Sequence, residues 1–223
     1  MPDLPPSPKR IGRPARISRA AIVEAAATVI ATDGFEKLTM RRLAQEVGST
    51  PMALYHHVRD RDALLVLLLD EIAAQIPRPS LPSEPLRRIE VAATAIHDTL
   101  VGVPWVVEVL TADDLLGRAA LWFVEQIIDG AIACGATPER AVYVYRSIWY
   151  YTAGELIIRA AATRRRAESP ARTRRERIFA DLDPGELPRL AGLGPDWTRL
   201  TTEDTYREGL VALIDGLLPQ ARH

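Results

Sequence analysis

The chain has 223 residues, of which 48% are hydrophobic and 26% are charged, and its formal net charge is -1. This length permits one domain with a sizeable core or two smaller ones. A net charge so close to zero excludes a general affinity for polyanions as an argument for function. The single cysteine, Cys134, cannot form an internal disulfide, which is typical of a reducing compartment.

The sequence also lacks the signals of secretion or membrane insertion. No charged-then-apolar leader opens the chain, and the longest apolar run, residues 63–69, is too short to cross a bilayer. Glycine and proline fall mostly between periodic segments and not inside alternating runs, which favours an all-α fold. We therefore expect a cytoplasmic, all-α protein.

The first 20 residues are strongly basic. Five cations oppose the single anion Asp3, a net charge of 5 minus 1, or +4; they are Lys9, Arg10, Arg13, Arg16 and Arg19. The sequence predicts a basic, flexible arm over residues 1–17. A solvated tail without a partner is an equal alternative for residues 1–8, whereas Arg10, Arg13 and Arg16 directly precede a folded bundle and are suited to contact phosphates or the minor groove.

A first helix follows the arm. Ser18 is a favourable N-cap and Gly34 a favourable end, and the apolar residues between them repeat on one face. These apolar residues are Ile22, Ala25, Ala26, Val29 and Ile30. That face is expected to support the two helices that come next.

Residues 38–58 predict two short helices joined by a glycine. Thr39 can cap the first helix, Gly48 can form the turn, and Ser49 or Thr50 can cap a second helix that starts with Pro51. Small Ala44 and the inward-facing Leu54 suit the close crossing of a helix-turn-helix, whose second helix can enter a major groove. An ordinary helical hairpin within an all-helical core is the alternative.

A fourth helix is expected to begin after Asp60 and to end near Ile76, because four prolines follow within nine residues. This proline-rich stretch indicates a linker and divides the chain into residues 18–76 and 77–223. Helices are predicted again over residues 86–101, 104–111, 115–134 and from 137 to about 164. Residues 164–202 are arginine-rich and punctuated by proline and glycine; a solvated loop with a short helix near 174–182 is favoured there over a second nucleic-acid patch.

The last predicted helix, residues 202–218, carries a long apolar stripe that requires a partner surface. The stripe consists of Tyr206, Leu210, Leu213, Ile214 and Leu217. With the helix that starts at Thr137, it predicts a four-helix dimer interface. Packing within a single chain is the alternative.

Several of these features together resemble the DNA-binding domain of the TetR family of bacterial transcription regulators. They are the Gly34-Phe35 corner, the L-T-x-R-x-L-A helix at residues 38–44 and the L-Y-x-H-V recognition helix at residues 54–58. The segments VPWVVEVL, YYTAGE and GLVALIDGLL resemble a tetracycline-repressor-like C-terminal domain, except that Val103 stands where a histidine is usual. The resemblance implies a homodimeric regulator, in most cases a repressor, that binds a palindromic operator and responds to a small-molecule effector.

The predicted DNA contacts lie on the arm, the two short helices and the turn after them. They are Arg10, Arg13, Arg16, Thr39, Arg41, Ser49, Thr50, Met52, Ala53, Tyr55, His56 and Arg59. The arginines, Thr39 and Tyr55 are expected at phosphates, and Thr50, Met52, Ala53 and His56 at base edges. No arginine or asparagine lies on the reading helix, so sequence preference is expected to come from thymine methyl groups and DNA shape.

The candidate effector residues are large aromatic and polar side chains on otherwise apolar helices, a composition that suits a small apolar ligand. They are His97, Trp105, Trp122, Tyr143, Arg146, Trp149, Tyr150 and Glu155. No metal site is predicted, because His56 and His57 are adjacent and lack a ligand at helical spacing. No catalytic motif or cofactor loop occurs, so we predict no enzyme; a helical carrier that binds a ligand but no DNA is the alternative.

Overall fold

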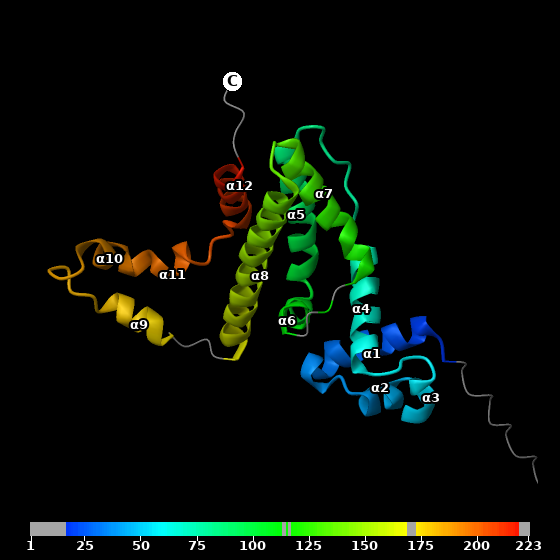
Figure 1. Ribbon diagram of the computed structural model, residues 1–223. Helices are drawn as coiled ribbons and strands as arrows, with labels where there is room; N and C mark the ends of the chain where they lie inside the picture. Colours follow the sequence, from blue (N-terminus) through cyan, green and yellow to red (C-terminus); the bar gives the residue numbers. More distant parts are fainter. Residues whose placement is uncertain (1–16, 113–114, 116, 169–172, 219–223) are drawn as a thin grey trace, which may run out of the picture. The chain divides into compact units, whose positions relative to one another are not determined.

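A computed structural model of the protein describes residues 17–112, 115, 117–168 and 173–218. Every regular element in these ranges is a helix, which confirms the predicted all-α class (Figure 1). The chain forms two compact units: Met1–Ala73 with Leu115–Arg118, here called the N-terminal unit, and Ala74–Asp114 with Ala119–His223, called the C-terminal unit. No single helix in the described ranges is long and apolar enough to cross a membrane; α5 and α6 reach that limit only as a joined pair, bent by 110°.

The N-terminal unit contains four α-helices whose ends follow from local sequence. They are α1 (Arg19–Asp33), α2 (Met40–Glu46), α3 (Pro51–Tyr55) and α4 (Arg61–Gln75), with the short η1 (Phe35–Lys37) between α1 and α2. The hydroxyls of Ser18, Thr39 and Thr50 accept backbone N–H groups at the starts of α1, α2 and α3. The predicted N-caps are thereby confirmed, with Thr50 and not Ser49 capping α3.

The core of the N-terminal unit is small and apolar. It combines one face of α1 with residues from α2, α3 and α4, and its fully buried large side chains are Ile22, Val29, Leu43, Leu54, Leu64 and Leu65. Gly117, from the short segment after α6, packs against α4: a β-carbon added to it would lie 3.0 Å from the carbonyl carbon of Leu69. Four residues distant in sequence therefore complete this unit.

The C-terminal unit is built around four long helices. They are α5 (Pro85–Val101), α7 (Leu121–Ala133), α8 (Pro138–Glu168) and α12 (Tyr206–Leu217), with α6 (Pro104–Ala112) after α5 and η2 (Arg118–Ala120) before α7. The helix expected over residues 115–134 is shorter, α7, because Gly117 before it packs against the backbone of α4. Gly130 allows α7 to cross α5 closely, since a β-carbon there would meet Ile89 at 2.6 Å.

Residues 173–201 form a helical excursion between α8 and α12, and not a largely irregular loop (Figure 1). It comprises α9 (Arg174–Ala180), α10 (Pro188–Leu193), η3 (Gly194–Asp196) and α11 (Trp197–Leu200). The half-buried rings of Phe179 and Trp197 stack with centroids 4.1 Å apart and connect α9 with α11. The short helix predicted near 174–182 is confirmed as α9, whereas periodicity misses α10 and α11 because each is shorter than two full apolar repeats.

Candidate nucleic-acid interface and effector region

The turn between α2 and α3 has the geometry that a helix-turn-helix requires. Gly48 has φ 68°, a conformation that costs little only for glycine. The Ser49 N–H donates to the Ala44 carbonyl at 2.8 Å and so closes the end of α2. Ala44 and Leu54 are buried, so the two helices cross through one small and one large apolar side chain.

Only one residue of α3 is buried, and the remainder of the helix is left to the surface. Leu54 is completely buried, whereas Met52 is 71% and Tyr55 is 44% exposed. Met52 and Tyr55 are therefore accessible to a partner molecule. The helix therefore presents the side chains expected to read DNA.

The other predicted DNA contacts have different surroundings. Thr39, Arg41, Thr50, His56 and Arg59 are exposed, while Ser49 and Ala53 are half-buried. The predicted arm contacts, Arg10, Arg13 and Arg16, lie outside the described residues.

Neighbouring cations of α2 differ in whether they are already paired. Arg42 contacts both Glu46 and Asp33 at 2.7 Å, and these hydrogen bonds raise its pKa. Arg42 thereby ties α2 to the end of α1. Arg41 is exposed one residue earlier, and the structure therefore separates a structural arginine from a candidate phosphate contact.

In the C-terminal unit, two of the predicted effector residues lie together. His97 of α5 is 3% exposed, and its Nε2 lies 3.0 Å from Oε2 of Glu155 on α8. Its Nδ1 lies 3.1 Å from Asp98, and its ring stacks on Tyr206 with centroids 3.6 Å apart. His97 therefore connects α5 with both α8 and α12.

A wider polar network surrounds this histidine, and of its other members only Glu155 was predicted as an effector contact. Arg159 contacts both Glu155 and Asp204, and these two partners raise the pKa of Arg159 while Arg159 lowers the pKa of Asp204. The hydroxyls of Tyr206 and Thr152 lie 2.8 Å apart. The sequence does contain a signal for the Glu155–Arg159 contact, since Arg159 follows Glu155 by one helical turn.

One buried polar atom in this region has no partner. The hydroxyl of Thr94 is buried and lacks a hydrogen bond within the described part of the chain. Thr94 lies one turn before His97 on α5. Because an unpaired buried hydroxyl is costly, it is a candidate contact for a bound molecule.

The remaining effector candidates are not gathered around His97. Tyr143, Arg146 and Tyr150 lie on an exposed face of α8, where the Arg146 guanidinium is 5.7 Å and 5.9 Å from the two ring centroids. Trp105, Trp122 and Trp149 are half-buried on three different helices. The Trp122 ring lies beneath the Arg78 guanidinium, at 5.3 Å.

The apolar stripe of α12 packs inside its own chain. Tyr206, Leu210 and Ile214 are buried where α12 packs on α5 and α8, and Leu213 and Leu217 are half-buried against the same core. This is the alternative of packing within one chain. It leaves little of the stripe for contact with a second subunit.

The N-terminal unit presents an exposed α3, and a separate helical unit follows it in the chain. This combination is typical of a helix-turn-helix transcription regulator. Two family patterns match: "Bacterial regulatory proteins, tetR family" over residues 22–68, and "Tetracyclin repressor-like, C-terminal domain" over residues 79–221. The chain therefore belongs to the TetR family, and it is a DNA-binding transcriptional regulator. The predicted resemblance is confirmed.

Individual relatives agree with this assignment. The chain is 29% identical to the HTH-type transcriptional repressor DrrR1 of Streptomyces coeruleorubidus over 210 residues, which are 88% of this chain and 75% of that protein. It is similar in fold to the TetR family protein ActR of Streptomyces coelicolor in complex with (S)-DNPA, with a TM-score of 0.71, 24% identity, and coverage of 91% of this chain and 98% of that one. BioQ with its double-stranded DNA operator gives a TM-score of 0.64 at 24% identity, covering 91% and 98%.

Proposed function

We propose that the protein is a homodimeric repressor that acts in the cytoplasm, binds a palindromic operator and is released when a small molecule binds its C-terminal unit. The exposure of Met52 and Tyr55 beside buried Leu54 is the observation that carries the proposal. Two such helices on a twofold particle would enter successive major grooves, with Arg41 and Arg59 at the flanking phosphates. The repressor DrrR1, which aligns with 88% of this chain, supports repression over activation.

The exposed face of α8 supports a dimer. Residues at alternating spacings of four and three form one stripe along it: Tyr143, Ser147, Tyr150, Gly154, Ile157 and Ala161. Tyr150 is 64% exposed, and a β-carbon on Gly154 would meet nothing within 4 Å. A 4-3 stripe of this kind packs against another helix at a shallow angle, so the same stripe of a second subunit is a suitable partner.

The polar groups of α5 and α8 support an effector site in the C-terminal unit. Thr94 supplies an unpaired buried hydroxyl, and one turn later buried His97 forms a pair with half-buried Glu155. Trp105 of α6 and Trp149 of α8 are half-buried aromatic residues of the same unit and stay candidate contacts away from His97. An effector needs only about 2.7 kcal/mol of coupling to lower DNA affinity by about 100-fold.

A gel-shift assay on the DNA upstream of the protein's own coding region tests the proposal. Tyr55→Ala and Arg41→Ala should each weaken the shift by about tenfold, as expected for loss of roughly 1–2 kcal/mol of contact. Arg189→Ala, an exposed arginine of the excursion, serves as the matched control and should leave the shift unchanged. A chain that binds small molecules but gives no salt-sensitive shift would instead be the carrier.

Thr94→Val tests the effector part separately. Removal of an unpaired buried hydroxyl should leave the free energy of unfolding unchanged or raise it by about 1 kcal/mol. A fraction of cell extract that releases the wild-type protein from DNA should be needed in larger amount to release Thr94→Val. Equal release by both proteins would remove Thr94 from the site.

A further inference from the structure

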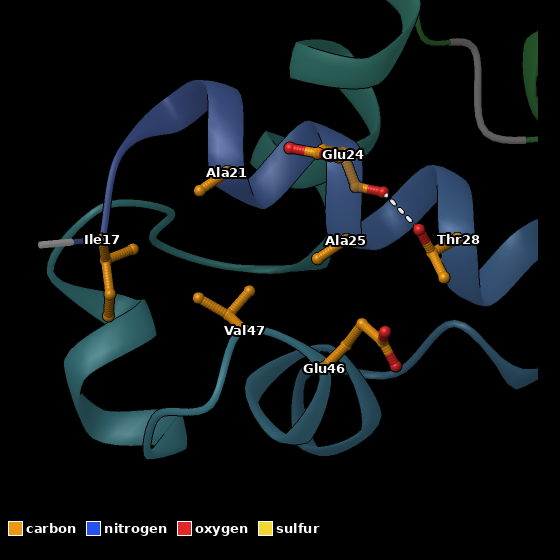
Figure 2. Close-up of a pocket in the computed structure, with 7 residues that line it drawn as sticks. All are labelled: Ile17, Ala21, Glu24, Ala25, Thr28, Glu46 and Val47. Atoms are coloured by element: carbon orange, nitrogen blue, oxygen red, sulfur yellow. Dashed lines mark hydrogen bonds between the residues drawn. The ribbon is translucent and has the colours of Figure 1, made fainter. Parts of the chain in front are cut away.

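A hollow in the N-terminal unit lies between α1 and the end of α2 (Figure 2). Its volume is about 300 Å³, and its lining comes from Ile17, from α1 and from residues 46–47. Figure 2 shows the small side chains of Ala21 and Ala25 pointing from α1 toward Val47 and Glu46. Alanines at these two facing positions leave the space that larger side chains would fill.

The lining of the hollow includes both apolar and acidic residues. Glu24 and Glu46 both line it. Glu46 is paired with Arg42 at 2.7 Å, whereas Glu24 has no ion-pair partner among the residues that the structure describes. Carboxylates in the lining repel DNA phosphates, so the hollow suits a cationic occupant with an apolar part.

We propose that the basic arm of this chain, residues 1–16, occupies the hollow when no DNA is bound. Ile17, the residue that directly follows the arm, already lies in its wall. The arm has arginines at every third position, Arg10, Arg13 and Arg16, with apolar Ile11 among them. It thus combines cations that unpaired Glu24 attracts with one apolar side chain that suits Ala21, Ala25 and Val47.

The length of the arm fits the hollow. The path along α1 from Ile17 to Thr28 covers 11 residues, or about 16 Å at the helical rise. Five residues of extended chain span about the same distance, so Gly12 reaches Thr28 when the arm turns back along α1. Because the arm is tethered at the wall of the hollow, its effective concentration is of millimolar order, far above that of a free organic cation.

Docking makes the arm's arginines unavailable to DNA and lowers affinity for every sequence equally. Only this consequence rests on the proposed function; the docking itself occurs without DNA. A DNA duplex would have to compete with Glu24 for the same cations. Docking of the arm in the hollow would therefore lower the affinity of the protein for non-specific DNA.

Disulfide trapping in the full-length, DNA-free protein tests the docking. In a Cys134→Ser background, Gly12→Cys is combined with Thr28→Cys, which lines the hollow, or with Ala27→Cys, an exposed α1 residue at the same level on another face. Equilibration with a glutathione redox buffer measures how often each pair meets. The Thr28 pair should form about tenfold more readily than the Ala27 pair, because a docked arm lies on one face only.

A charge substitution distinguishes docking from simple proximity. Glu24→Gln should reduce the excess of the Thr28 pair to less than about threefold, and so should 0.5 M salt, which screens surface charges. Glu36→Gln, an exposed carboxylate of η1 outside the hollow, should not change the excess. Equal trapping of the two pairs, or trapping that Glu24→Gln does not change, overturns the proposal. Thermal unfolding of each variant shows that the N-terminal unit is folded.

DNA binding provides the second measurement. In the chain without added cysteines, Glu24→Gln should raise affinity for non-specific duplex by about threefold more than Glu36→Gln does, because both remove one negative charge but only one frees the arm. If neither protein binds DNA while trapping succeeds, the proposed function fails and the docking stands. If both bind DNA equally and trapping is uniform, the docking fails and the proposed function stands.

Discussion

Two glycines of α12 show how one residue type can be required at one position and dispensable seven residues later. A β-carbon on Gly209 would lie 2.1 Å from the hydroxyl of Tyr151, which donates to the Tyr206 carbonyl. Around Gly216 nothing lies within 4 Å. Gly209 thus lets α8 approach α12 within one chain, whereas the helix alone would favour alanine at both positions.

Gly209→Ala should lower the free energy of unfolding by about 1–3 kcal/mol, because the Tyr151 ring must move away from its partner. Gly216→Ala is the matched control in the same helix and should raise it by about 0.5–1 kcal/mol, since alanine costs less backbone entropy. Urea unfolding of both variants measures the difference. A stabilised Gly209→Ala variant would show that Tyr151 is not fixed.

The phenol of Tyr206 gives the stability of the C-terminal unit a dependence on alkaline pH. Burial raises its pKa above the ordinary value of 10.0. The contribution of this phenol to stability is complete below its pKa in the unfolded chain, about 10, and is lost as the pH rises toward its higher pKa in the folded chain. The reason is that the phenol ionises at a lower pH in the unfolded chain than in the folded one. The urea midpoint should therefore fall as the pH rises above about 10.

Tyr206→Phe separates this contribution from those of the other tyrosines. At pH 8 the variant should be less stable by about 1 kcal/mol, because Thr152 loses its hydroxyl partner. Above about pH 10 its urea midpoint should decline less steeply than that of the wild type, so the two curves converge. Parallel curves would mean that the phenol is accessible to hydroxide in the folded state.

At the scale of single residues, the sequence predicts what depends on immediate neighbours. Ser18, Thr39 and Thr50 cap their helices as expected, since a cap is decided within three residues. The partners of His97 could not be predicted in the same way. Glu155 follows it by 58 residues, and only the packing of α5 on α8 brings the two side chains together.

Among the elements, α3 depends most on its cap, because its five residues cannot sustain a helix by themselves. Thr50→Ala removes the bond from the Ala53 N–H to the Thr50 hydroxyl and should cost about 1 kcal/mol, whereas Thr50→Ser should cost only a few tenths. Thermal unfolding measures both values. Equal stability of the two variants would indicate that Leu54 alone holds α3 in place.

The sequence is less informative for elements whose apolar residues are few or have several possible partners. In the excursion, four large apolar side chains remain exposed, so its pattern resembles that of a loop: Ile178, Leu187, Leu193 and Leu200. The stripe of α12 is clear, but a stripe does not specify its partner. The structure buries it against α5 and α8 of the same chain.

For the whole molecule, composition and periodicity identify the all-α class and the DNA-reading head, because both depend on short, ordered motifs. They do not show that Leu115–Arg118 belongs with the N-terminal unit. That association depends on Gly117 approaching the backbone of α4, a contact across 48 residues of sequence. Long-range packing of this kind has no local signature.

The proposed dimer depends on the 4-3 stripe of α8. Tyr150 is the most exposed side chain of the 4-3 stripe, so a charge there would be buried at a symmetric interface beside its own copy. Tyr150→Glu should convert the dimer to a monomer in sedimentation analysis and lower operator affinity by at least about 100-fold, because one head must bind without the other. The helical signal and thermal unfolding of the head should be retained.

Thr163→Glu places the same charge on an exposed residue of α8 outside the stripe and should remain dimeric. The pair therefore separates an effect of position from an effect of charge. If Tyr150→Glu also remains a dimer and binds the operator normally, then the α8 stripe faces solvent in the assembled regulator. The subunits must in that case meet through another surface, and the exposed apolar residues of the excursion would be the next to test.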